Sequence, residues 1–87
     1  MISYADQREE FLKASHPQLY QQMKKDGSLQ DHLKQVQREA SEMFDQLRAQ
    51  MLVSPDLPRE FQARLQAVQS IPEQVDEIVR NEIVYAL

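Results

Sequence analysis

The two histidines, His16 and His32, offer the widest chemistry in this sequence, because imidazole can bind a metal ion or transfer a proton near neutral pH. A helical metal site places a second ligand three or four positions from a histidine. Leu29 stands three positions before His32, and neither histidine has another one four positions away. His32 also borders an apolar stripe, which favours a hydrogen-bonded packing role. We therefore expect no metal site.

Nucleophilic catalysis has equally little support. The chain contains no cysteine, and no serine lies in a glycine-flanked turn or at a readable spacing from a histidine and an acid. Paired acids such as Glu9–Glu10 and Asp76–Glu77 point apart on a helix, because adjacent residues do not face each other. The single glycine, Gly27, excludes a glycine-rich phosphate loop. These patterns predict a protein that is not an enzyme and needs no cofactor.

Basic and amide side chains within residues 17–38 imitate a DNA-binding helix–turn–helix. A short helix, a turn at Gly27 and a second helix would present donors for base edges and phosphates, namely Lys24, Lys25, Gln30, Lys34 and Arg38. Asp26, Asp31 and Glu39 bring negative charge to the same region, and the second helix would be several times the usual length. Direct nucleic-acid binding is therefore disfavoured, and an ordinary helical corner is preferred.

The C-terminal residues form a candidate protein-docking surface. Tyr85 lies in the apolar stretch 83–87, and charged side chains precede it, namely Asp76, Glu77, Arg80 and Glu82. Aromatic anchors with charged rims are typical of surfaces that bind proteins. The same residues can instead complete a helical core, with the Tyr85 hydroxyl left at the surface. The sequence favours the core interpretation without excluding the interface.

A seven-residue apolar repeat predicts the helix around which the other segments are arranged. Its members follow one another at spacings of 4, 3, 4, 3 and 4, namely Leu29, Leu33, Val36, Ala40, Met43 and Leu47. No glycine or proline interrupts residues 29–53, which allows one helix of roughly 37 Å. From Met43 onward the stripe widens. We therefore expect more than one neighbour to cover the second half of this helix.

Two shorter helices are predicted before this central one. Ser3 can cap the first, which should end near Ser15–His16. Its exposed side is expected to carry five charged residues, namely Asp6, Arg8, Glu9, Glu10 and Lys13. Pro17 then begins a short helix over residues 18–25, and Gly27 ends it.

After the central helix, two prolines within residues 54–58 interrupt the chain. A fourth helix should begin near Pro58 and continue to the C-terminus. Pro72 either kinks or briefly breaks it, and the sequence does not decide which. The predicted fold is all-α: a single domain over residues 1–87, built as a small antiparallel bundle with a long central helix at about 29–53 and a kinked C-terminal helix. A compact domain of this size has a radius of gyration of about 12 Å.

Charge and composition bear on partners and location. The net charge is −4; residues 1–40 carry six basic and six acidic side chains, whereas residues 41–87 carry four basic and eight acidic ones. The acidic half suits a basic protein surface, although a merely solvated face is the simpler interpretation. The absence of cysteine, an apolar run of only five residues and a polar N-terminus without a basic region predict a cytoplasmic protein without membrane contact.

From end to end, the sequence resembles the transposon-encoded TnpV family. The resembling residues are Tyr4, Arg8, Phe11-Leu12-Lys13, Pro17, Leu19-Tyr20, Gly27, Leu29, His32-Leu33, Val36, Ala40, Ile71, Glu77-Ile78-Val79 and Asn81-Glu82-Ile83-Val84-Tyr85. The segment 54–69 is shorter than in the family, and Pro72 stands where the family continues a helix. The resemblance implies a helical protein of a mobile genetic element and supplies no catalytic residues.

Together, the residues and the resemblance predict a non-catalytic accessory protein of a mobile element that works by protein contact. The expected partner is a nucleic-acid-processing machine, such as a transposase or recombinase complex, or a CRISPR effector nuclease that the protein antagonises. The rival hypothesis is a DNA-binding regulator that uses residues 17–38. The sequence does not identify the partner or the oligomeric state, and a homodimer is one of the arrangements left open.

Overall fold

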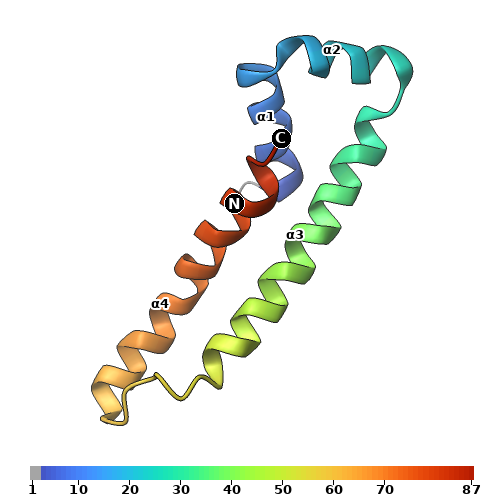
Figure 1. The fold of residues 1–87 in the computed structure, drawn as a ribbon. Helices are drawn as coiled ribbons and strands as arrows, with labels where there is room; N and C mark the ends of the chain where they lie inside the picture. The colour runs from blue at the N-terminus through green and yellow to red at the C-terminus, as the bar shows by residue number, and fades with distance from the viewer. Residues whose placement is uncertain (1–2) are drawn as a thin grey trace.

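The computed structural model describes residues 3–87 and contains helices without any strand over this range (Figure 1). The helices are α1 (Tyr4–Ser15), α2 (Pro17–Asp26), α3 (Leu29–Leu52) and α4 (Phe61–Val79). A π-helical turn, η1 (Arg80–Val84), continues α4. The all-α prediction is confirmed, and so is the long central helix, which ends one residue before the predicted limit of about 53.

Most helix ends follow the local signals in the sequence. The Ser3 hydroxyl caps α1 by accepting a hydrogen bond from the Asp6 amide at 3.1 Å. Gly27 ends α2 with a φ of 79°, which is costly for residues with a side chain. The fourth helix begins at Phe61, three residues later than predicted from Pro58. The reason is the Glu60 carboxylate, which caps α4 by accepting from the Gln62 and Ala63 amides.

Pro72 lies inside α4, and the helix passes through it without a break. Proline lacks an amide hydrogen, so the Val68 carbonyl four residues earlier loses its regular helical donor. Tight packing on both sides of this position keeps the helix continuous, since Ile71 and Val75 are buried against α3 residues such as Ala40. Of the two sequence-based options for Pro72, the structure excludes a break.

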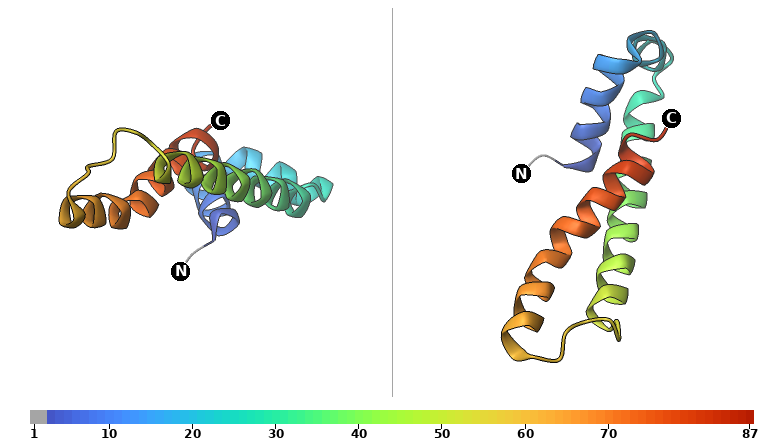
Figure 2. Two further views of the ribbon diagram at one scale, coloured as in Figure 1. Left: turned by 90° about the horizontal axis from the view of Figure 1, so that it is seen from below. Right: turned by 60° about the vertical axis from the view of Figure 1, so that its left-hand side comes forward.

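The overall shape is elongated. Helices α3 and α4 form a long antiparallel hairpin, while α1 and α2 lie beside the first half of α3 only (Figures 1 and 2). The extents are 55 × 21 × 20 Å and the radius of gyration is 16.4 Å, so the expected compact value of about 12 Å is wrong. The hairpin is longer than the helices available to cover it, because α1 has 12 residues and α3 has 24.

Two apolar clusters form the core. The first joins α1, α2 and the start of α3 through Leu12, Tyr20, Leu29 and Leu33. The second joins α3 to α4 through Ala40, Ile71, Val75 and Val79. The first four members of the seven-residue repeat, Leu29, Leu33, Val36 and Ala40, are therefore buried by the chain itself.

The second half of the hairpin is thinly covered. Met43 and Leu47, the last members of the repeat, are only half-buried. The prediction that more than one neighbour covers this half of α3 holds only at its beginning, where Tyr4 of α1 lines a groove with Phe44; α4 is the helix that lies beside the rest (Figure 2). Residues 43–53, in α3 and directly after it, and residues 61–70 of α4 are called the open half below. Apolar side chains at its end are exposed, at 80% for Val53, 76% for Phe61 and 46% for Leu65.

Candidate functional site

Arg8 is the buried charged residue of the structure, with 6% of its surface exposed. Its Nη1 donates to three carbonyl oxygens at the end of the chain, those of Ala86 at 2.7 Å, Val84 at 2.8 Å and Ile83 at 3.4 Å. Its Nε donates to His32 Nε2 at 3.2 Å. One guanidinium thus joins α1, α3 and the residues that follow α4.

These bonds satisfy carbonyl groups that a helix end leaves without donors. At the end of η1 the Tyr85 amide donates to the Arg80 carbonyl at 2.9 Å. Arg8 donates to the carbonyls of residues that follow Arg80. Burial lowers the pKa of Arg8, but a guanidinium stays charged at neutral pH. Charged donors make stronger hydrogen bonds than neutral ones, so this cluster fixes the C-terminal turn against α1.

The sequence prediction that Arg8 belongs to the exposed charged side of the first helix is wrong. Tyr4, Arg8 and Leu12 are spaced by four residues, which places them on one helix face. Tyr4 and Leu12 belong to the apolar side of the first helix, so this spacing was the available signal.

His32 accepts the hydrogen bond from Arg8 through Nε2, as expected for a packing histidine. Burial and the neighbouring Arg8 charge lower the pKa of His32 below its ordinary value, while Glu39 opposes the shift. Above pH 6.5, the ordinary value, His32 is neutral both folded and unfolded, and its bond to Arg8 contributes fully to stability. As the pH falls from there through the lowered pKa, the unfolded chain takes up the proton first, so stability is lost.

This linkage predicts that the stability of the native chain depends more strongly on pH than that of His32→Gln. The side-chain oxygen of the glutamine can still accept from Arg8 but does not titrate. The free energy of unfolding, measured by urea denaturation, should fall from pH 7.5 to pH 5.5 by more in the native chain than in His32→Gln. All other residues are the same in both proteins, so their contributions cancel in the comparison. Equal losses in the two proteins would show that the Arg8–His32 bond does not respond to pH.

The predicted C-terminal docking residues divide into two groups. Asp76 and Arg80 form the first group, which is engaged within the chain. The Asp76 carboxylate accepts from the Tyr4 hydroxyl of α1 at 2.8 Å and lies 3.0 Å from Arg80 Nε. Burial, followed by the bond to Asp76, raises the pKa of Tyr4. Glu77 and Glu82 are exposed. Tyr85 is 44% exposed and rests edge-on against Phe11, with 5.5 Å between ring centroids.

The candidate DNA contacts do not converge. Gln30, Lys34 and Arg38 line one groove beside α1, and Asp6 and Glu9 line it with them. Lys24 lies on α2 with its Nζ 5.5 Å from the Tyr20 ring centroid.

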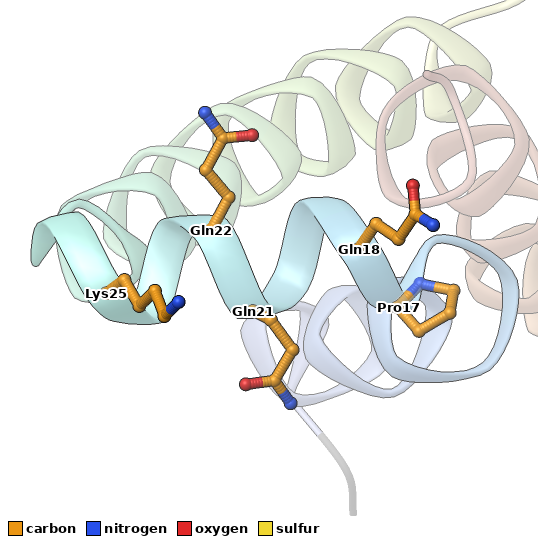
Figure 3. Close-up of a pocket in the computed structure, with 5 residues that line it drawn as sticks. All are labelled: Pro17, Gln18, Gln21, Gln22 and Lys25. Atoms are coloured by element: carbon orange, nitrogen blue, oxygen red, sulfur yellow. The ribbon is translucent and has the colours of Figure 1, made fainter.

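Lys25 borders a shallow patch on the outer side of α2, shared with Pro17, Gln18, Gln21 and Gln22 (Figure 3). Gln18 and Gln22 project from one side of the helix and Gln21 from the other, so these amides do not face a common ligand.

A groove that the sequence did not predict opens where α1 begins. Three helices line it, over a volume of about 480 Å³. Its apolar and aromatic surface comes from Tyr4 of α1, Phe44 of α3 and Pro72 of α4, and its carboxylates from Asp45, Glu73 and Asp76. Serine and glutamine side chains complete the lining of this α1–α3–α4 groove, and none of its lining residues among 3–87 is lysine or arginine.

Other kinds of site find no support in the described chain. Within residues 3–87, no three histidine, aspartate or glutamate side chains lie close enough together to hold a metal ion. Over the same residues, no helix combines the length and the hydropathy that a membrane-spanning segment requires.

The fold and its groove define a class: small all-α proteins built on a long, partly covered helical hairpin. Within this class, the family model described as transposon-encoded protein TnpV matches residues 1–84, and the chain belongs to that family. The resemblance seen in the sequence is therefore confirmed. No curated protein matches the chain. No solved structure matches it either.

Proposed function

We propose that this protein is a non-catalytic accessory factor of a mobile genetic element and that it acts by binding another protein. One observation carries the proposal: the open half exposes large apolar side chains that no third helix of the chain covers. Val53, Phe61 and Leu65 are 80%, 76% and 46% exposed. Exposed apolar surface of this kind, next to charged side chains, is typical of protein-binding sites.

The partner that these features suit best is a nucleic-acid-processing machine. The family is transposon-associated. Residues 41–87, which include the whole open half, carry eight acidic and four basic side chains. Proteins that handle nucleic acids present basic surfaces, and an acidic protein can occupy such a surface through complementary charge. A transposase or recombinase complex and a CRISPR effector nuclease, which the protein would antagonise, are the specific forms of this proposal.

The rival function, a DNA-binding regulator, draws on the shared groove of Gln30, Lys34 and Arg38. Asp6 and Glu9 in the same groove would repel phosphates, which disfavours it. The two functions separate in a mobility-shift assay on duplex DNA at low salt. Retardation that Lys34→Ala and Arg38→Ala weaken would support the rival, and its absence would exclude the rival.

The test of the proposed function is affinity capture with the tagged chain from a host that carries the element, with nuclease treatment of the extract. We expect a protein partner that remains bound after nuclease treatment and that rebinds the purified chain. The double variant Phe61→Gln with Leu65→Gln should weaken rebinding by at least about tenfold, because buried aromatic anchors dominate such interfaces. The matched control, Gln62→Ala with Gln66→Ala on the same helix, should bind normally. Recovery of nucleic acid alone would contradict the proposal.

A further inference from the structure

We infer that the α1–α3–α4 groove binds a basic amphipathic helical segment of the partner protein. This inference rests on the proposed function and adds to it the location and the chemistry of the contact. The occupant should present arginine or lysine side chains beside an apolar face.

The geometry of the hairpin indicates a helical occupant. In the first half of the molecule, α1 packs against α3 and η1 and forms a third layer (Figures 1 and 2). The groove lies where α1 begins. It therefore marks the place at which this third layer stops, while α3 and α4 continue side by side. Helix-binding grooves take apolar side chains spaced by three or four residues, and Tyr4, Phe44 and Pro72 provide a matching surface.

The charges of the groove determine whether its occupant should be positively or negatively charged. Asp45 and Glu73 are exposed on facing helices, and neither forms an ion pair within residues 3–87. Asp76 is partly neutralised by Arg80, 3.0 Å away, which leaves Asp45 and Glu73 as the main unpaired charges. A guanidinium or ammonium group matches these carboxylates, whereas a phosphate backbone would be repelled.

The acceptors of the groove are carboxylate oxygens, from Asp45, Glu73 and Asp76. Arginine, which has five N–H donors and no acceptor, suits a site that offers several carboxylate oxygens. Among basic residues, the groove should therefore prefer arginine.

The test uses the full-length chain and a fluorescein-labelled synthetic helical peptide with leucines spaced by four residues and arginines on the flanks. A second peptide replaces every arginine with glutamate. Fluorescence anisotropy should show binding of the arginine peptide and none of the glutamate peptide. The double variant Asp45→Asn with Glu73→Gln should reduce affinity for the arginine peptide at least about tenfold, the scale of a lost close charge pair.

The matched control is Glu39→Gln with Glu42→Gln, which removes two exposed acids from α3 outside the groove. It changes the net charge equally and should leave the affinity within about twofold, because distant surface charges are screened. Equal binding of both peptides, or equal loss in both double variants, would overturn the inference. A dimer in light scattering that Asp45→Asn with Glu73→Gln dissociates would also overturn the inference, because a second copy of the chain would then fill the groove.

The captured partner separates the two proposals. If it binds Asp45→Asn with Glu73→Gln as tightly as the native chain, the groove inference is wrong and the proposed function stands. If no protein is captured, the proposed function fails whatever the peptide result.

Discussion

Replacing Arg8 with methionine is expected to lower the free energy of unfolding by about 2–3 kcal/mol, because buried carbonyl groups lose their donor. The Val84 carbonyl is the most affected, since its bond to Arg8 is buried. The Ile83 and Ala86 carbonyls are only partly buried, and water can replace the lost donor there. A small domain has a stability of about 5 kcal/mol at the lower end of the usual range, so the effect is large.

One effect opposes this loss. Burying a charge is costly, and an apolar side chain of similar volume removes that cost. In a buried pair of opposite charges, replacing both partners can even be neutral. Here the partners of Arg8 are backbone carbonyls and His32, which the substitution leaves in place. The loss of hydrogen bonds should therefore exceed the gain from removing the charge.

Urea denaturation followed by circular dichroism at constant pH measures the effect. At roughly 4–8 °C per kcal/mol, the midpoint of thermal unfolding should fall by about 8–24 °C. The stability of Arg8→Lys should lie between those of the native chain and Arg8→Met, because an ammonium can still donate to the carbonyls. Arg38→Met, at an exposed position of α3, is the matched control and should change stability by less than about 0.5 kcal/mol. A loss of that small size in Arg8→Met would contradict the assigned role of Arg8.

The all-α fold and the central helix could be predicted from the sequence because their signals are local. The repeat from Leu29 to Ala40 and the cap at Ser3 follow from residue spacing and short-range hydrogen bonds, and the structure contains both. The start of α4 was placed at Pro58 because proline is a strong local signal. The capping by Glu60 was missed since glutamate is not among the preferred cap residues.

The site was harder to predict because it depends on where one helix stops relative to others. The groove exists because α1 begins partway along the seam of α3 and α4, and no local pattern encodes that offset. Arg8 was assigned to the surface because a charged residue is seldom buried. Of the predicted docking residues, Asp76 lines the groove and Arg80 pairs with it, whereas Asp45 and Glu73 were not among the candidates. Their roles in binding remain predictions.

The central claim of this account is that the chain covers one half of its hairpin for folding and leaves the open half for a partner. Amide hydrogen exchange in the isolated chain should reflect this division. Residues 33–40 and 75–79 lie in the buried core, whereas residues 44–52 and 61–68 have fewer buried contacts. Amides of the open half should exchange at least about tenfold faster, which corresponds to about 1.4 kcal/mol of local opening free energy.

The same measurement on the complex tests the claim most directly. When the captured protein partner is added, exchange should slow within residues 41–52 and 61–73 and stay unchanged on α2. Slowing of exchange confined to residues 17–38 in the complex would contradict the account. Uniform protection along the whole hairpin of the isolated chain would contradict it as well.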